Sequence, residues 1–370
     1  MNKNIIILVS AMNLGGAQRV VSILCDQWSQ KGYSITLIST FTGKKTDHYK
    51  VHENVIVKSL STNSIFPQSK ILNLMAKLVQ LRHIIKNENP DVVISFLTRV
   101  NVASALSMLG LQSSLIICER TWTPFATLSN KFFWMYRILF KRVTRIIVQT
   151  DESQKWLNLH FPAIPVAVIP NPVSYPLTLQ KGEIIQPHKV MSDDKKVILA
   201  CGRLHKFKQF DLLIRAYAKI KDKYSNWNLV ILGEGEERAE LNKVLKNLDV
   251  SSSIFLPGSA GNMSEWYERA DLFVLSSSVE GFPNVLLEAM SYGLPSISFD
   301  CDTGPRDMIQ DGFNGVLINP EDRESGLIKA LEKMITDTPF RKSIAENSIL
   351  IRDKYSVESI MQKWNNVLDS

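Results

Sequence analysis

Cysteine is scarce in this sequence of 370 residues, which contains four. Cys25, Cys118, Cys201 and Cys301 each stand alone, with no CxxC pair and no cluster of Cys with His. This spacing argues against a disulfide scaffold and against a zinc site, and it is typical of a protein from a reducing cytoplasm.

Long apolar runs are also missing. The best candidate, VNVASALSMLGL, falls short of the roughly 20 apolar residues that a spanning helix needs, and the first run, IIILV, is too short for a secretory signal. We therefore expect a soluble chain. GxSxG, HExxH and Walker A motifs are absent and the six histidines form no obvious constellation, so nucleophilic catalysis has little support.

Acidic residues are few in the first half of the chain. Residues 1–170 contain 19 Lys and Arg against 8 Asp and Glu, a difference of +11, whereas the whole chain carries +7. This asymmetry predicts that the first half meets an anionic partner. Nucleic acid, a phospholipid surface and a pyrophosphate-bearing acceptor all fit, and composition does not choose among them.

Short, continuous apolar runs with helical patterns between them are what the sequence does contain. They predict strands at 4–11, 33–40, 54–60, 91–97, 114–120, 145–150 and 166–170, and then at 196–203, 228–235, 253–258, 271–277, 295–300 and 315–319. Strands that are apolar throughout are typical of parallel sheets covered on both faces. The alternation of strand and helix, present twice, predicts an α/β protein with two doubly wound parallel-sheet domains.

Domain boundaries follow from composition. The proline-rich, polar stretch 171–195 is predicted to be a linker between a first domain, 1–170, and a second, 196–354. In the tail 355–370, apolar residues at four-residue spacing predict an amphipathic helix. Ligands of open α/β sheets bind at the carboxyl ends of the strands, so two such domains would face each other across a cleft.

Two glutamates stand out in the stretch LSSSVEGFPNVLLEAMSYG. Glu280 lies on the loop after a predicted strand, and Glu288 lies about one turn into a helix that begins at Pro283. A carboxylate among apolar neighbours needs a partner. We expect Glu288 to bind ribose hydroxyls and Glu280 to bind sugar hydroxyls with the backbone of Gly281, Phe282 and Asn284. Alternatively, Glu280 is a solvated loop residue and Glu288 bonds to a nearby helix terminus.

Cations and glycines occupy other predicted strand ends. Arg203 and Lys208 follow the first strand of the second domain, just before a helix near Phe210, and could clamp a pyrophosphate. The alternative is a solvated basic loop. Gly15 and Gly16 precede a first-domain helix and would allow an anion to approach its N-terminus, although they could equally form a simple turn. The pattern is not GxGxxG, so a dinucleotide has poor support.

Polar residues also follow two strands of the first domain. Arg99 and Asn101 come after one strand, and Glu119 and Arg120 come after another. They could bind the hydroxyls or phosphate of an acceptor.

The segment 131–146 is predicted to be a basic, aromatic helix. Arg137, Lys141 and Arg145 recur every four residues, which would suit an anionic membrane. A sheet-packing helix with a solvated basic face is the alternative.

A metal site is a weaker possibility. Asp300 and Asp302 form a DxD pattern that could hold a divalent ion on a nucleotide diphosphate. Both carboxylates also suit a turn at a strand end, and Arg203 with Lys208 could already neutralise the phosphates. We therefore expect no metal.

Taken in order, these motifs resemble one family. The series GGAQRV, ERTWTP, VIPNPV, GRLHKFKQFDLL, ILGEGEER, EGFPNVLLEAMSYGLPSIS and GPRDMI, between Met1 and about Asn319, resembles the retaining glycosyltransferases of family 4. The resemblance implies the GT-B fold, with two Rossmann-like domains, a nucleotide-sugar held mainly by the second domain and an acceptor by the first. It also implies that the last helix packs back on the first domain.

By this resemblance the motif residues acquire roles. Glu280 and Glu288 match the E-x7-E pair, so that Glu280 would contact the donor sugar and Glu288 the ribose. Arg203 and Lys208 match the pair that neutralises the departing diphosphate, and Gly16 matches the turn near the donor phosphate. No cofactor or metal is implied. The region CERTWTP departs from the family because many relatives carry a histidine there, so Glu119 and Arg120 become the candidates for contact with the sugar.

The expected activity is transfer of a hexose or N-acetylhexosamine from a nucleotide-diphosphate sugar, with UDP-sugar preferred, in the synthesis of O-antigen, capsule or a similar surface glycan. The expected acceptor is a polyprenyl-diphosphate-linked saccharide or lipid A-core at the cytoplasmic, inner face of the membrane, with no nucleic acid. Alternatives are a GDP-mannose-type mannosyltransferase, a lipopolysaccharide-core transferase, a sugar-nucleotide epimerase of the same fold, and a non-catalytic module that binds membrane or nucleic acid.

Overall fold

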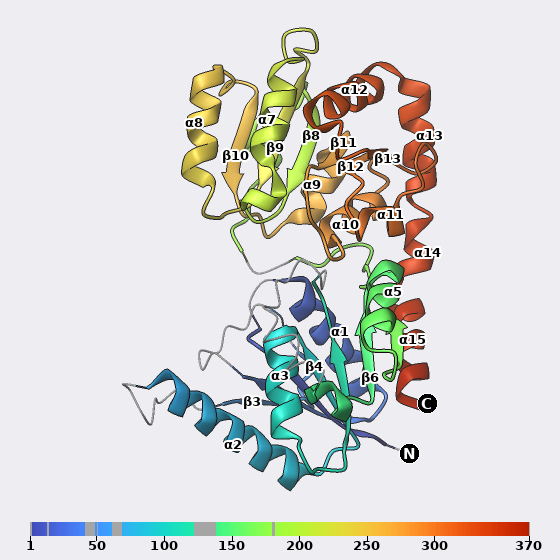
Figure 1. Ribbon diagram of the computed structural model, residues 1–370. Coiled ribbons are helices and arrows are strands. Elements are labelled where there is room, and N and C mark those ends of the chain that lie inside the picture. The colour runs from blue at the N-terminus through green and yellow to red at the C-terminus, as the bar shows by residue number, and fades with distance from the viewer. Residues whose placement is uncertain are drawn as a thin grey trace. The chain divides into compact units, whose positions relative to one another are not determined.

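The structure, a computed structural model, describes residues 2–12, 15–40, 49, 51–60, 69–121, 138–179 and 182–369. The chain divides into two compact units (Figure 1). Unit 1 contains the residues up to Asn171 together with those from Ile360 onward, and unit 2 runs from Pro172 to Ser359.

The predicted linker is part of unit 2. The side chain of Asn262 accepts a hydrogen bond from the backbone N–H of Ile185 at 3.0 Å and donates one to its carbonyl at 3.1 Å. Trp266 Nε1 donates to the same carbonyl at 2.9 Å. The proline-rich composition predicted a linker, but these side chains from a later segment fix its backbone to unit 2.

Unit 1 is built on a parallel sheet with the strand order β3-β2-β1-β4-β5-β6-β7 in the described residues. The strands are β1 (Asn4–Val9), β2 (Ser34–Ser39), β3 (Ile56–Ser59), β4 (Val92–Phe96), β5 (Ser114–Cys118), β6 (Arg145–Val148) and β7 (Val166–Val168). The helices are α1 (Gly16–Gln30), α2 (Lys70–Glu88), α3 (Thr98–Ser107), the 3-10 turn η1 (Phe140–Arg142), α5 (Asp151–His160) and, from Ile360 onward, α15 (Val357–Asp369).

Unit 2 repeats this plan with the parallel order β10-β9-β8-β11-β12-β13 among the described residues. Its strands are β8 (Lys196–Cys201), β9 (Trp227–Leu232), β10 (Ile254–Gly258), β11 (Leu272–Leu275), β12 (Ser296–Phe299) and β13 (Val316–Ile318). Its helices are α6 (Pro187–Val190), η2 (Lys206–Lys208), α7 (Phe210–Ala218), α8 (Arg238–Leu248), α9 (Met263–Arg269), α10 (Asn284–Ser291), α11 (Pro305–Met308), α12 (Arg323–Thr336), α13 (Thr338–Ser348) and α14 (Ile351–Tyr355).

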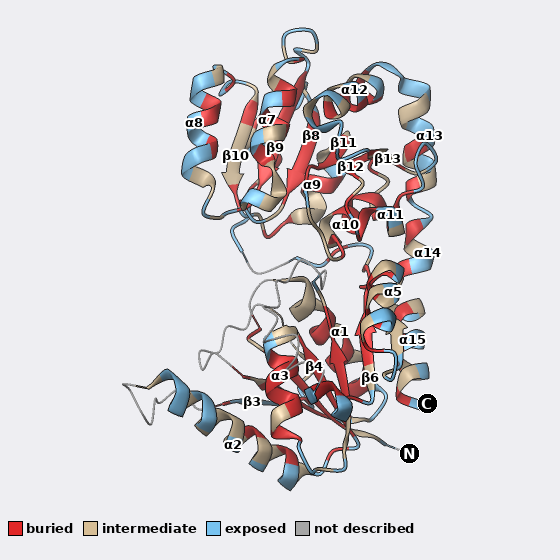
Figure 2. Cartoon of the chain, in the orientation of Figure 1, coloured by how far each residue is buried: buried red, intermediate tan, exposed pale blue. Residues whose placement is uncertain are grey.

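Every strand predicted from the sequence is present, and the apolar runs of the central strands are buried for the predicted reason, whereas β3 at the sheet edge is largely exposed. Ile5 to Val9 in β1 have no exposed surface, and the central strands of both sheets are red in Figure 2. Helices lie over both faces of these strands, so neither set of alternating side chains meets water. The prediction of two doubly wound parallel-sheet domains is confirmed.

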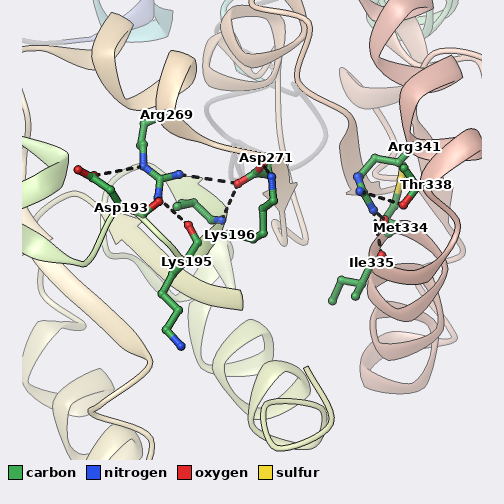
Figure 3. A network of polar contacts seen from close by, with 10 residues as sticks. Asp193, Lys195, Lys196, Arg269, Asp271, Met334, Ile335, Thr338 and Arg341 are labelled. Carbon is green, nitrogen blue, oxygen red and sulfur yellow. Dashed lines mark hydrogen bonds and ion pairs between the residues drawn. The ribbon is translucent and has the colours of Figure 1, made fainter. Parts of the chain in front are cut away.

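Both strand orders reverse direction at a switch point, between β1 and β4 in unit 1 and between β8 and β11 in unit 2. Crevices at the carboxyl ends of the strands beside such a point are the usual ligand sites of open α/β sheets. In unit 2 the opposite, amino-terminal ends are tied by ion pairs (Figure 3). Asp271, just before β11, binds Lys196 Nζ at 2.7 Å and the Val197 N–H at 2.9 Å, and Arg269 adds a hydrogen bond to the Lys195 carbonyl at 2.6 Å. These contacts fix β8 beside β11.

The predicted helix 131–146 needs correction where it is described. Residues 122–137, including Arg137, lie outside the described residues. Lys141 belongs to the 3-10 turn η1, and Arg145 is the first residue of β6, so the two do not lie along one helical face. Thr144 N donates to the Leu115 carbonyl at 2.8 Å, and this pairing with the sheet ends the helical stretch before Arg145.

Candidate active site

Lys208 and Glu280 form an ion pair at the carboxyl ends of β8 and β11. Lys208 Nζ lies 2.5 Å from Glu280 Oε1, and both side chains are largely buried. Lys208 is held by its backbone, because its carbonyl accepts a hydrogen bond from Ser276 Oγ at 2.7 Å and its N–H donates to His205 at 2.8 Å. The backbone carbonyl of Glu280 accepts one from Thr303 Oγ1 at 2.5 Å. A cation and a carboxylate are thus fixed side by side.

Arg203 lies on the same loop but has a different partner. Its Nη2 is 3.1 Å from Glu236 Oε2, and the Arg203 side chain is exposed. Glu236 also lies 3.4 Å from His205 Nε2, and the hydrogen bond of its carboxylate to its own backbone N–H, together with Arg203, lowers the pKa of Glu236. The ion pair with Glu236 leaves the guanidinium at the surface, where an exposed pair costs little to rearrange.

Glycines bring the loops after β8 and β9 into close contact. Gly233 has a φ of +145°, and a Cβ there would lie 1.9 Å from the carbonyl oxygen of Gly202. Gly202, with a φ of +150°, packs in turn against the Lys208 side chain, whose Cε would be 3.3 Å from a Cβ. Only glycine satisfies both the positive φ and the approach of Gly233. The backbone beside Lys208 is therefore set by the GEG motif of the next strand end.

Glu288 is buried in α10 and is not an unpaired charge. Tyr267 of α9 donates a hydrogen bond from its hydroxyl to Glu288 Oε2 at 3.0 Å. The same hydroxyl lies 3.5 Å from Cys201 Sγ, at the end of β8. Burial, aided by Cys201 and Glu288, raises the pKa of Tyr267 well above its usual range, so the phenol remains a donor. The prediction that Glu288 requires a partner is confirmed, and the partner is a tyrosine.

The remaining predicted donor residues surround the start of α10. Pro283 is the N-cap of this helix, one residue from the predicted start, and Asn284 is its first residue. Phe282 is buried and packs on Tyr355 with ring centroids 5.7 Å apart, whereas Gly281 and Asn284 are half-buried. Phe282 thus anchors the loop through its side chain.

In unit 1, Gly16 is the first residue of α1 and Gly15 is its N-cap. Gly15 has no side-chain cap, and its carbonyl accepts the hydrogen bond from Arg19 N at 3.1 Å. The helix therefore starts where the sequence predicts, at the carboxyl end of β1.

The acceptor candidates of unit 1 form two groups. Glu119, after β5, is buried and accepts hydrogen bonds from Asn101 Nδ2 at 2.7 Å and Thr98 Oγ1 at 2.8 Å. Asn101 has no exposed surface and also accepts one from Ser95 Oγ at 2.7 Å, so it orients Glu119. Arg99 projects from α3 and is exposed.

Arg120 is held against aromatic rings. Its guanidinium carbon lies 4.9 Å from the Phe96 ring centroid and 5.9 Å from that of Trp364, and Nη1 donates to Asn171 Oδ1 at 3.1 Å. Burial lowers the pKa of Arg120, an effect that Cys118 and Glu119 partly oppose. Among the described residues, its buried Nε and Nη2 have no hydrogen-bond acceptor. The guanidinium of Arg120 is thus removed from water, and only part of its hydrogen-bonding capacity is used.

The DxD pattern does not assemble a cluster. Asp300 pairs with Arg306 at 2.8 Å, and Asp302 is exposed. Within the described ranges no group of three or more His, Cys, Asp or Glu is placed to hold a metal ion. Metal independence stays a prediction.

Sequence reasoning missed the residues that support the site. Tyr267 donates a hydrogen bond to Glu288, Thr303 to the backbone of Glu280, and Ser276 to the backbone of Lys208. Each of these supporting residues is distant in sequence from the residue that it contacts. Glu236 had a local signal, since it follows the glycines of ILGEGEER directly.

Two family models match the chain. The model described as Glycosyltransferase Family 4 matches residues 14–175, and the model described as Glycosyl transferases group 1 matches residues 182–350. With two Rossmann-like parallel-sheet domains, the chain is a glycosyltransferase of the GT-B fold. It belongs to the family 4 glycosyltransferases.

Relatives and solved structures agree with this assignment. The amylovoran biosynthesis glycosyltransferase AmsD of Erwinia amylovora is 28% identical, covering 100% of each chain. A Campylobacter jejuni α-1,4-N-acetyl-D-galactosaminyltransferase, named for a saccharide on PP-undecaprenol, is 26% identical over 96% of each chain. The crystal structure of Anabaena HepE with UDP and glucose has a TM-score of 0.82 at 18% identity over 100% of each chain, which is a likeness of fold.

Proposed function

We propose that this protein is a retaining glycosyltransferase that moves a hexose or N-acetylhexosamine from a UDP-sugar to a lipid-linked saccharide during bacterial surface-glycan synthesis. The observation that carries the proposal is the Lys208–Glu280 pair at 2.5 Å, beside the switch point of unit 2. It places a phosphate-binding cation next to a carboxylate suited to sugar hydroxyls.

The donor would lie across these groups. Lys208 and Arg203 bind the diphosphate and stabilise its negative charge as it leaves, which is electrostatic catalysis by fixed cations. Gly16, at the start of α1, is the proposed phosphate contact from unit 1. Glu280, with the backbone of Gly281 and Phe282, holds the donor sugar.

The buried carboxylate of Glu288 accepts hydrogen bonds from the ribose hydroxyls. Tyr267 donates to Oε2 of the same carboxylate at 3.0 Å. A carboxylate oxygen can accept more than one hydrogen bond, so both partners are compatible.

The acceptor is proposed to contact unit 1. Arg99 and Arg120 are its cations there, and Glu119 is the nearby carboxylate. An acceptor hydroxyl attacks the donor sugar on the face from which the diphosphate departs, and the hydroxyl proton passes to the leaving phosphate, so the anomeric configuration is retained. No metal ion is required in this proposal, because Lys208 and Arg203 supply the positive charge.

The substrate class rests on the relatives. AmsD is named for amylovoran biosynthesis, and the Campylobacter relative is named for an undecaprenol-linked saccharide and an N-acetylgalactosaminyl transfer. HepE was solved with UDP and glucose. None of the helices in the described part of the chain has the length and apolar character to span a bilayer. We therefore propose a peripheral association with the membrane that carries the acceptor.

A donor panel tests the base and the sugar. UDP- and GDP-sugars are added singly, and the unfolding midpoint is measured, because a ligand of the native state raises it by mass action. We expect stabilisation by UDP and one or more UDP-sugars. If only GDP-sugars stabilise the protein, the UDP assignment is wrong.

Product analysis tests the reaction. With the stabilising donor and a detergent-dispersed polyprenyl-diphosphate saccharide, we expect transfer that persists in EDTA, and an α-anomer by NMR from an α-linked donor. Release of free epimerised sugar in the absence of acceptor would instead show the epimerase. A β-linked product would refute the retaining mechanism.

A further inference from the structure

Helix α2 in unit 1 exposes several large apolar side chains to solvent. Ile71 is 74% exposed, Val79 65% and Met75 54%, and Leu72 and Leu74 are also exposed. Only Leu81 and Ile85, in the second half of the helix, are buried. Figure 2 shows α2 mostly in the colours of exposed and intermediate residues.

Three of the exposed residues lie along one side of the helix, whereas Leu74, seven residues before Leu81, lies on the line of the buried pair. A helix turns about 100° per residue, so Ile71, Met75 and Val79, four residues apart, follow one another along its side. The buried Leu81 and Ile85 lie on a different line, which faces the unit. Figure 1 shows the N-terminal half of α2 extending beyond the described strands and other helices of unit 1. The helix therefore has a buried face and a second, exposed apolar face.

Positive charge predominates on α2, mostly away from this face, because Lys70 and Lys77 lie on the opposite side from Met75 and Arg82 donates to the backbone carbonyls of unit 1. Residues 70–88 contain four cations, Lys70, Lys77, Arg82 and Lys86, and a single acidic residue, Glu88. Glu88 is already paired with Lys58 of β3. An apolar stripe on a basic helix matches the two layers of an anionic bilayer surface, because lipid phosphates attract the cations and the acyl boundary accepts the apolar side chains.

We propose that α2 is a membrane-docking element that lies in the surface of an anionic phospholipid bilayer, with Ile71, Met75 and Val79 inserted. A protein partner would need complementary acidic residues, whereas anionic lipid supplies both the charge and the apolar layer. The inference rests on the proposed function, because a lipid-linked acceptor requires contact with a membrane.

Vesicle flotation tests the apolar face. The vesicles contain equal parts of phosphatidylglycerol and phosphatidylcholine, and pure phosphatidylcholine serves for comparison. The variant Ile71→Gln/Met75→Gln/Val79→Gln keeps the charge and the helix propensity. We expect its partitioning to anionic vesicles to fall by about 10-fold or more, since three inserted side chains are lost. Leu159→Gln, at a residue 78% exposed on α5, is the matched control and should partition like the unaltered protein.

A charge-matched comparison tests the cations. Lys70→Gln/Lys86→Gln removes two positive charges from α2, and Lys329→Gln/Lys342→Gln removes two from exposed positions of unit 2. Only the α2 pair should weaken binding markedly, and the effect should shrink as salt is added. Equal loss in both pairs would show a response to net charge and would overturn the assignment to α2.

A fluorescent probe tests insertion directly. All four native cysteines are buried, so Met75→Cys adds an accessible thiol that takes an environment-sensitive label. We expect a blue shift with anionic vesicles at residue 75 and none for Leu159→Cys. An unchanged spectrum on vesicle-bound protein would refute insertion.

Two further outcomes separate the alternatives. A dimer that the triple Gln variant converts to monomer would mean that a second copy covers this face, and the proposal would be wrong. Transfer to a detergent-dispersed acceptor should be unaffected in the α2 variants, whereas Lys208→Ala should lose transfer and still float with vesicles. The docking proposal and the proposed function can therefore fail separately.

Discussion

Lys208 Nζ lies 2.5 Å from Glu280 Oε1 across 72 residues of sequence. The pair joins the loops after β8 and β11, so each residue limits the position of the other. Because both side chains are largely buried, the attraction between them is less screened than that of a surface pair. The phosphate-binding and sugar-binding parts of the proposed donor site are therefore one electrostatic unit.

The first prediction concerns this pair. Lys208→Ala and Glu280→Ala should each reduce kcat/KM for transfer by about 100-fold or more, the usual loss when one stabilising group of a transition state is removed. Lys206→Ala, on the same loop but exposed, is the control and should change kcat/KM little. Steady-state kinetics with a saturating acceptor provide the measurement. Wild-type activity in both site variants would rule out the assigned roles.

A double-mutant cycle on stability completes this test. If the two side chains interact as the distance indicates, the double variant should be less destabilised than the sum of the single variants. Additive losses would show that the pair is not coupled in solution.

Tyr267→Phe should weaken the proposed nucleotide site, although Tyr267 is not itself a proposed ligand contact. The hydroxyl donates to the buried Glu288 at 3.0 Å, and its removal leaves that carboxylate with one partner fewer. We expect a loss of about 1–3 kcal/mol in the free energy of unfolding and a higher Kd for UDP by calorimetry. Tyr224→Phe removes a hydroxyl that donates to Glu332 on another side of unit 2, and it should leave the Kd unchanged. An unaltered Kd in Tyr267→Phe would separate Glu288 from nucleotide binding.

Gly233→Ala, compared with Gly312→Ala, distinguishes the cost of a steric contact from the cost of a positive φ. A Cβ at residue 233 would lie 1.9 Å from the Gly202 carbonyl oxygen, so the loop beside Lys208 has to move. We expect a destabilisation of at least about 3 kcal/mol, from strain and overpacking together, and loss of UDP binding. Gly312→Ala is the control, with a φ of +73° and no atom within 4 Å, and it should cost only about 1–2 kcal/mol. Equal midpoints by calorimetry would contradict the close approach.

The sequence predicted the scaffold well because its central strands are buried on both faces and so are apolar along their whole length. Glu288 was also identifiable, since a carboxylate inside VLLEAM needs a partner. Tyr267 was not, because its contact with Glu288 is created by the packing of α9 against α10. The attachment of the stretch 171–195 was not identifiable for the same reason, because Asn262 and Trp266 bind Ile185 through tertiary hydrogen bonds. Arg145 shows the remaining type of error, in which a helical period was extended into residues that pair in a sheet.

Alkaline pH should destabilise the protein through buried thiols. Burial raises the pKa of Cys201 and of Cys301 to about 12, from 9.0 for a free thiol. The folded state therefore holds these protons more tightly than the unfolded state. Their contribution to stability is complete below pH 9 and is lost as the pH rises from 9 towards 12.

Urea unfolding across this range measures the effect. Cys301→Ala should show a smaller fall in midpoint above pH 9 than the unaltered protein. Thiol reagents at pH 8 should react slowly until urea is added. Rapid reaction of the native protein would show that these cysteines are accessible.

Trp364→Ala should loosen unit 1, although residue 364 lies at the far end of the chain. Its ring has no exposed surface and meets Trp28 of α1 edge to face, with centroids 5.9 Å apart. It also packs against Phe96 of β4 and beneath the guanidinium of Arg120. Removing a buried tryptophan costs about 3–5 kcal/mol, so hydrogen exchange of the peptides from α1 and β4 should accelerate.

The effect of Trp364→Ala should extend to the proposed acceptor site, because Arg120 would lose one of the two rings against which its guanidinium packs. We expect a higher KM for the acceptor, with the KM for the donor less affected. Lys363→Ala, at the exposed neighbouring position of α15, is the matched control and should leave both exchange and KM unchanged. Unchanged exchange in Trp364→Ala would mean that α15 contributes little to unit 1. Faster exchange with an unchanged acceptor KM would instead remove Arg120 from the acceptor site, since the support of its guanidinium would then not matter for binding.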